Sequence, residues 1–150
     1  MNLQFLKEEL IRYEGRKQVV YLDTLGLKTA GIGHLLVGAE RDMNVGQSIT
    51  DEQIDKWFDA DVIRCTHIAK NCVKNFDQID DTRQRVLCQL AFNMGNKLSG
   101  FVNTLKHIEA GEFKLAADEL QNSKWFGQVG NRGPETCFAL RTGLYGWRNK

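Results

Sequence analysis

The chain has very little proline and no excess of charge of either sign. Pro134 is the only proline among 150 residues. This scarcity, with scattered short polar segments, argues against a β-sandwich, which depends on many Gly- and Pro-rich turns. Lysine and arginine total 20 against 19 aspartate and glutamate residues, giving a net charge of +1. Because nucleic-acid binders usually carry a basic patch or stripe and we find none, no nucleic-acid partner is expected.

Long apolar runs are also missing. No segment approaches the roughly 18 consecutive apolar residues of a membrane-spanning helix, so no membrane span is expected. The first ten residues include Lys7, Glu8 and Glu9 and lack the apolar centre of a secretory signal peptide. We therefore expect one globular domain that folds in the cytoplasm of the cell that makes it.

The four cysteines match no zinc or redox spacing. Cys65, Cys72, Cys88 and Cys137 are expected to be buried thiols with structural roles, and Cys65 and Cys72 to share one face of a helix. Neither a metal nor a cofactor is expected.

The first third of the chain predicts a helix followed by a hairpin. Apolar residues recur at helical spacing from Leu3 to Tyr13, and Gly15 is a plausible stop, so the helix ends near Glu14. Residues 19–22 and 28–32 are β-rich, and residues 23–26 between them have turn chemistry.

A long helix is predicted from Thr50 to Cys72. Thr50 and Gln53 fit a capping box, and one apolar stripe runs along the segment. Asp61 lies on that stripe, where an unpaired charge would be costly. His34, at the end of the predicted hairpin, is the best partner; the alternative is that Asp61 reaches water at the edge of the stripe.

The remaining sequence is predicted to be helical, which gives an α+β, mostly α, fold of one domain, 1–150. We expect a lobe with the hairpin at about 14–56, a linking helix at about 51–72, and a helical lobe at about 73–150 that includes the N-terminal helix 1–13. A cleft between the lobes is the expected site. The three tryptophans are expected to be core residues rather than sugar platforms, whereas Tyr21 in the hairpin could equally line the cleft.

Two carboxylates flank the first change of structure, Glu14 at the helix end and Asp23 in the hairpin turn. Glycoside cleavage needs two such groups, one to protonate the departing oxygen and one to stay ionised. Their spacing alone is weak support, because two acids nine residues apart occur in most proteins.

The wider pattern resembles the phage-type lysozymes, glycoside hydrolase family 24. The resemblance rests first on Glu14-Gly15, Tyr21-Leu22-Asp23-Thr24, Gly26 and Thr29-Ala30-Gly31-Ile32-Gly33-His34-Leu35-Leu36. Further matches follow in order along nearly the whole chain: Phe92 with Met94-Gly95, Gly100-Phe101 with Asn103, Ser123 with Trp125, Gln128, Asn131-Arg132, and Arg141-Thr142-Gly143.

The resemblance implies a role for several residues. Glu14 matches the general acid, Asp23 the second carboxylate, and Thr29 the threonine that faces the attacking water. Arg132 matches an arginine that pairs with the catalytic glutamate, and the pairing of His34 with Asp61 is also implied. Substrate contacts are implied for Leu35, Phe92 and Thr104. The alternatives are an ordinary strand threonine for Thr29, a core residue for Phe92 and a solvated charge for Arg132.

The implied activity is that of a lysozyme, or N-acetylmuramidase. It hydrolyses the β-1,4 bond between N-acetylmuramic acid and N-acetylglucosamine in bacterial peptidoglycan, with inversion. The implied setting is a monomeric phage endolysin that stays in the host cytoplasm until a separate holin gives it access to the periplasm and wall. The rivals are a lytic transglycosylase, a tail-associated lysozyme and a catalytically silent wall-binding module.

Two departures from the family pattern stand out. The segment between Leu36 and Trp57 is shorter than in well-known members by roughly a helix, and Glu119 stands where an amide is expected. The near-neutral charge predicts weaker, less salt-dependent attraction to an anionic wall than in a basic relative.

Overall fold

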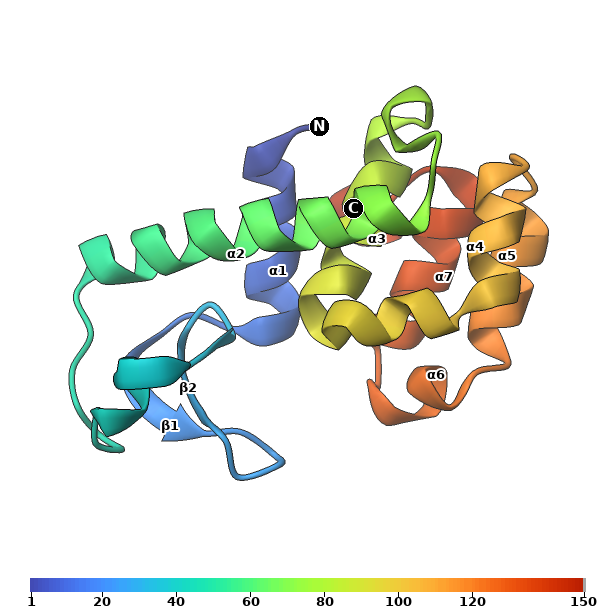
Figure 1. The fold of residues 1–150 in the computed structure, drawn as a ribbon. Coiled ribbons are helices and arrows are strands. Elements are labelled where there is room, and N and C mark those ends of the chain that lie inside the picture. Colours follow the sequence, from blue (N-terminus) through green and yellow to red (C-terminus); the bar gives the residue numbers. More distant parts are fainter. Residues whose placement is uncertain (150) are drawn as a thin grey trace. The chain divides into compact units, whose positions relative to one another are not determined.

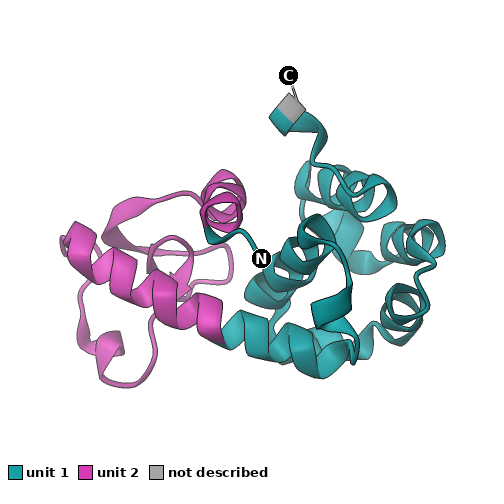
Figure 2. Ribbon diagram, turned by 90° about the horizontal axis from the view of Figure 1, so that it is seen from above, with its two compact units in different colours: residues 1–3, 64–150 teal, residues 4–63 magenta. Residues whose placement is uncertain are grey.

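The computed structural model describes residues 1–149 and divides into two compact units. Figure 2 colours residues 4–63 as one unit and residues 1–3 with those from 64 onward as the other. Helix α2 (Asp51–Cys72) contributes to both. The mostly helical α+β fold predicted from the sequence is confirmed.

The unit of residues 4–63 holds helix α1 (Leu3–Glu14), three strands and a short 3₁₀ helix (Figure 1). The strands are β1 (Lys17–Leu22), β2 (Lys28–Gly31) and β3 (His34–Leu35), antiparallel in the order β1-β2-β3. The predicted hairpin is present, whereas β3 was not predicted. The 3₁₀ helix η1 (Gly38–Asp42) is tied to the sheet by Lys28, whose Nζ donates to the carbonyl oxygens of Arg41 and Met43, both at 2.8 Å.

Helix α1 ends where the sequence predicts. Gly15 has φ +75°, and its N–H donates to the carbonyl of Ile11 at 2.8 Å, which closes the last turn. The helix falls in the same unit as the hairpin, whereas we expected it with the helical lobe. The reason lies in its contacts with α2: Lys7 pairs with Asp55 at 3.2 Å and lies 5.3 Å from the ring centre of Phe58.

Helix α2 has its predicted bounds. The hydroxyl of Thr50 accepts a hydrogen bond from the N–H of Gln53 at 3.1 Å, which caps the first turn. The predicted stripe is mostly buried; its buried members within residues 51–63 are Ile54, Trp57, Phe58 and Val62, and Asp61 among them is only 2% exposed. The other buried apolar residues of the same unit are Leu6 and Leu10 of α1 and Val20, Ala30, Ile32, Leu36 and Ile49.

The other unit is a helical bundle. After α2 come η2 (Phe76–Gln78), α3 (Asp81–Met94), η3 (Gly95–Gly100), α4 (Val102–Glu109), α5 (Phe113–Gln121), α6 (Lys124–Gln128), α7 (Arg132–Thr142) and η4 (Gly146–Asn149). Helix α5 packs against α4 and α7, and the middle of α3, Gln84 to Ala91, is buried. Asp80 caps α3 by accepting from the N–H of Arg83 at 3.1 Å.

The cysteines and tryptophans lie largely in the core. Cys65, Cys88 and Cys137 are buried, Cys72 is half-buried, and none of the four forms a disulfide. Trp57 and Trp125 are buried as predicted, but Trp147 is only half-buried. Within residues 1–149, none of the helices combines the length and the apolar character needed to span a bilayer.

Candidate active site

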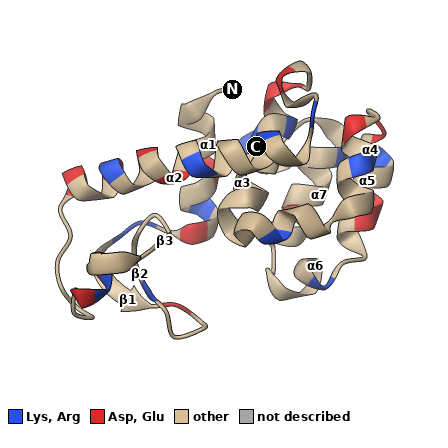
Figure 3. Cartoon of the chain, in the orientation of Figure 1, with Lys and Arg blue, Asp and Glu red and all other residues tan. Residues whose placement is uncertain are grey.

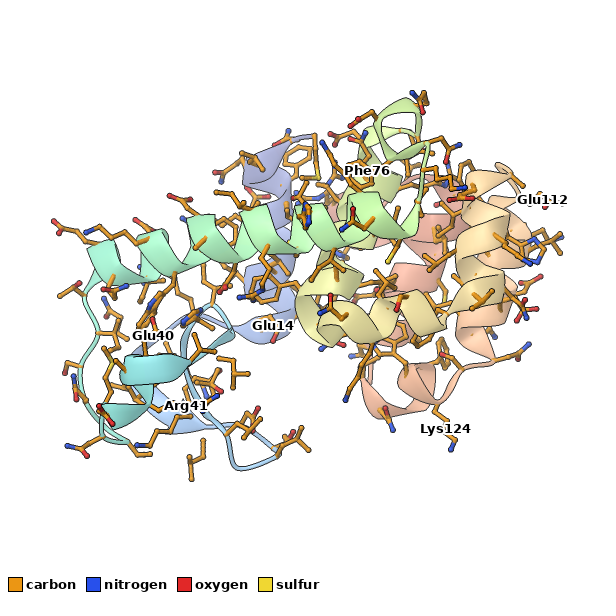
Figure 4. All side chains as sticks on the ribbon, viewed as in Figure 1. Glu14, Glu40, Arg41, Phe76, Glu112 and Lys124 are labelled. Carbon is orange, nitrogen blue, oxygen red and sulfur yellow. The ribbon has the colours of Figure 1, made fainter. Side chains whose placement is uncertain are left out.

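Glu14 is the last residue of α1 and lies against Gly33, in the turn between β2 and β3 (Figure 4 labels Glu14). Gly33 has φ +58°, and a Cβ atom on it would come 2.7 Å from Oε2 of Glu14 and 2.9 Å from Cβ of Glu14. Only glycine combines this backbone conformation with that close approach. In the sequence, Gly33 stands out only as part of the run from Thr29 to Leu36 that resembles the family, not as the residue against which Glu14 rests.

Asp23 is held by its own turn. Its Oδ1 accepts hydrogen bonds from the N–H groups of Leu25 and Leu27, both at 2.8 Å. The backbone closes around it, because the Asp23 N–H donates to the carbonyl of Leu27 at 2.9 Å. Figure 3 shows acidic residues both at the end of α1 and in the β1–β2 turn. The two carboxylates therefore belong to one unit, each on a well-defined backbone.

Tyr21 lies within electrostatic reach of both carboxylates. Partial burial, then the negative charges of Glu14 and Asp23, raise the pKa of its phenol above the ordinary value. The ammonium of Lys17 lies 4.1 Å from the centre of the Tyr21 ring, a cation–π contact. Tyr21 therefore stands beside the pair of acids and not in the core.

Thr29 pairs with Tyr21 across the β1–β2 ladder and is 5% exposed. Its hydroxyl donates to the carbonyl of Leu27 at 3.0 Å. The oxygen keeps lone pairs that can accept a hydrogen bond from a water or a sugar hydroxyl. Leu35, on the other side of β2, is 42% exposed and available for contact with a ligand.

His34 and Asp61 form the pair predicted from the apolar stripe, with Nδ1 2.7 Å from Oδ2. The sequence did not predict the rest of the cluster. Nε2 of His34 lies 3.0 Å from Oε1 of Glu40, and the ring stacks on Trp57 with 4.5 Å between centroids. The Trp57 indole N–H donates to Oε2 of Glu40 at 2.5 Å. Figure 4 labels Glu40 on η1.

The charges in this cluster favour an imidazolium. Both ring nitrogens of His34 face carboxylates, and both can donate only when the ring is protonated. Burial lowers the pKa of His34, but the hydrogen bonds and charges of Asp61 and Glu40 outweigh it and raise that pKa. Burial raises the pKa of Glu40, but the N–H of Val37, His34 and Trp57 together lower it.

The remaining predicted residues lie in the helical unit. Arg132, at the start of α7, is buried; its Nε donates to Oε1 of Gln89 at 2.8 Å and its Nη2 to the Gln89 carbonyl at 3.2 Å. Gln89 in turn donates to the hydroxyl of Thr136 at 2.8 Å. This network orients Arg132, so its reading as a solvated charge is wrong; its predicted pairing with Glu14 stays a prediction. Phe92 is half-buried, and Thr104 is 4% exposed, which leaves little surface for a sugar contact.

Two further features lie outside these groups. A cavity of about 400 Å³ in the helical unit is lined by Ile68, Asn71, Cys72, Asn96, Ser99 and Leu105, none of them a predicted site residue. Among residues 1–149, no group of three or more His, Cys, Asp or Glu side chains could hold a metal ion.

Comparison with known proteins identifies the family of the chain. The family model described as Phage lysozyme matches residues 11–136, so the chain belongs to the phage lysozyme family. It is therefore a peptidoglycan-lytic enzyme of the glycosidase class.

Individual relatives are modestly similar over long stretches. A probable T4-type lysozyme 2 of Dictyostelium discoideum is 29% identical, with 92% of this chain and 94% of that protein covered. The pre-baseplate central spike protein Gp5 of Enterobacteria phage T4 is also 29% identical, over 92% of this chain but 28% of that protein. An endolysin of Acyrthosiphon pisum secondary endosymbiont phage 1 is 27% identical, covering 76% of this chain and 72% of that protein.

Proposed function

We propose that the chain is a lysozyme that hydrolyses the β-1,4 bond between N-acetylmuramic acid and N-acetylglucosamine. The observation that carries the proposal is the position of Glu14, held against Gly33 in the same unit as Asp23. A protonated Glu14 donates its proton to the oxygen of the departing sugar. The reaction needs no metal or cofactor.

Asp23 and Thr29 position and activate the attacking water. As a carboxylate, Asp23 faces the positive charge that develops at the sugar carbon and takes up the proton released by the attacking water. The two backbone N–H groups on its Oδ1 hold the carboxyl group in position. Thr29, whose hydroxyl proton is directed to the Leu27 carbonyl, presents acceptor lone pairs to the same water.

The proposed stereochemical course is inversion. Inverting glycosidases hold their carboxyl groups about 6.5–9.5 Å apart to admit a water, and retaining ones about 5–5.5 Å. The separate anchoring of Glu14 at a helix end and of Asp23 in a turn beyond β1 supports the wider arrangement. Water then attacks the face opposite the departing sugar.

Other residues complete the proposal. The glycan is contacted by Leu35, Phe92 and Thr104. Because Thr104 is only 4% exposed, its contact with the glycan is small. Arg132, oriented by Gln89, remains the predicted partner of Glu14. His34 and Asp61 support the sheet that carries the site.

The proposed setting is lysis of a phage-infected cell. The relative named as an endolysin supports it. The enzyme works as a monomer, is held in the host cytoplasm until a holin opens the inner membrane, and then reaches the wall.

Product analysis tests the reaction. Purified peptidoglycan is digested, and the fragments are examined by mass spectrometry and by proton NMR before mutarotation. We expect hydrated reducing ends with the α-anomer formed first. Anhydro sugars would identify a lytic transglycosylase, and an initial β-anomer would make Asp23 a nucleophile; either result contradicts the proposed reaction.

A further inference from the structure

Three sulfur atoms from three segments of the helical unit meet in its core. Cys65 lies on α2, Cys88 on α3 and Met1 at the start of the chain. The Cys88 thiol donates to the thioether sulfur of Met1, with 3.6 Å between Sγ and Sδ, and is also hydrogen-bonded to the thiol of Cys65. The lysozyme reaction proposed above uses none of the three.

The spacing suits a shared metal ion. Thiolate ligands lie about 2.3 Å from a bound zinc ion, and two such ligands on a tetrahedral centre are about 3.8 Å apart. The distance between the sulfurs of Cys88 and Met1, 3.6 Å, is within a few tenths of an ångström of that separation. A cation could enter among the sulfurs with small side-chain movements.

The donor set selects the class of metal. Thiolate and thioether sulfurs are soft ligands that favour Cu(I), whereas hard cations require oxygen ligands. The surroundings agree: Cys65 and Cys88 are 1% and 0% exposed, and the side chain of Met1 is 10% exposed, so the three sulfurs are shielded from water. We propose that Cys65, Cys88 and Met1 form a site for one thiophilic monovalent cation, Cu(I) or its redox-inert analogue Ag(I).

Binding is a substitution without electron transfer. Two S–H bonds break, two metal–thiolate bonds form, two protons leave to solvent, and the Met1 thioether adds as a neutral third ligand. The site gains one negative charge. The positive charge of the Lys70 ammonium acts on Cys88 and offsets this negative charge. The hydroxyl of Thr66, 3.6 Å from the Cys88 sulfur, can donate to the thiolate.

The chain supplies its own controls. Cys137 is also buried but lies on α7, and burial raises the pKa of its thiol to about 11. Cys72 is half-buried and lines the cavity described above, so it is the control for non-specific binding of a metal ion by an accessible thiol. Neither is one of the three sulfur-bearing residues that define the proposed site.

The test is a competition titration of the reduced full chain with Cu(I) under anaerobic conditions, using a chromophoric Cu(I) chelator. We expect one equivalent to bind, at least about 100-fold more weakly in Cys65→Ser and Cys88→Ser, and unchanged in Cys72→Ser and Cys137→Ser. The same equivalent of Ag(I) should raise the unfolding temperature of the wild type and of both controls only. Equal binding by all five proteins, or loss in either control, would overturn the site.

A measurement on the unsubstituted chain covers the case in which a buried serine prevents folding. X-ray absorption of the one-equivalent Cu(I) complex should show sulfur neighbours only. With selenomethionine in place of methionine, selenium should join the ligand shell, because Met1 is the thioether in contact with Cys88. Nitrogen or oxygen ligands, or a shell without selenium, would refute the proposed site.

Discussion

The carboxyl group of Glu14 rests on the backbone of Gly33, so that a Cβ atom at residue 33 would lie 2.7 Å from Oε2. A substitution there tests the position of Glu14 without touching its chemistry. Gly33→Ala should lower lytic activity at least about 10-fold, because the new methyl group displaces the carboxyl. A left-handed backbone also costs an alanine about 1–2 kcal/mol of stability.

Gly38→Ala is the matched control for that substitution. Gly38 has φ +56°, close to that of Gly33, but a Cβ atom there would meet nothing within 4 Å. The control should lose similar stability in denaturant unfolding and keep nearly full activity per folded molecule. Equal activities of the two variants would show that Gly33 does not position Glu14.

The ion pair of His34 and Asp61 predicts a pH-dependent cost for Asp61→Asn. Because the pKa of His34 is raised in the folded state, its contribution is complete below the unfolded value of about 6.5 and is lost as pH rises through the folded value. The substitution should cost about 3–5 kcal/mol at pH 5.5, as for a broken buried pair, and nearer the 1 kcal/mol of a hydrogen bond at pH 9. Urea unfolding at both pH values measures the difference, and an equal cost would exclude the imidazolium.

The substitution Glu40→Gln tests the same cluster at the acidic end of its pH dependence. The pKa of Glu40 is lowered in the folded state, so its contribution is present above the unfolded value of about 4.5 and is lost as pH falls through the folded value. The substitution should therefore cost most between about pH 4.5 and 6.5, where Glu40 and His34 are both charged, and little near pH 3. Asp42→Gln, on the same 3₁₀ helix, is a control that should show no such maximum.

The sequence predicted two features that depend on neighbours along the chain: the stop at Gly15 follows from turn chemistry, and the bounds of α2 follow from capping and the apolar stripe. It also predicted one tertiary contact, the pairing of Asp61 with His34, because a charge on an apolar stripe needs a partner. Glu40 was missed because its position depends on the path of the chain after Leu36, where no periodic pattern exists. Strand β3 was missed because its two residues, His34 and Leu35, are too few to show an alternating pattern. The buried indole N–H of Trp57, which needs an acceptor, was the available indication of Glu40.

The role of Gly33 was missed for a different reason. A glycine in a turn predicts a positive φ, but its contact with Glu14 is set by packing between the end of α1 and the β2–β3 turn. The unit to which α1 belongs depends likewise on contacts with α2, such as that of Lys7 with Asp55. Tertiary contacts of this kind leave no trace in periodicity or composition.

The most direct test of the account is lysis by Glu14→Gln, measured as loss of turbidity of outer-membrane-permeabilised bacteria. The amide keeps the shape of the side chain but cannot act as the acid, so activity should fall by at least about 100-fold. The unfolding transition of the variant should show that its fold is intact. Glu52→Gln, the same change at an exposed position in the same unit, should lyse cells at the wild-type rate. Lysis by folded Glu14→Gln at the rate of Glu52→Gln would contradict the assignment of Glu14 as the catalytic acid.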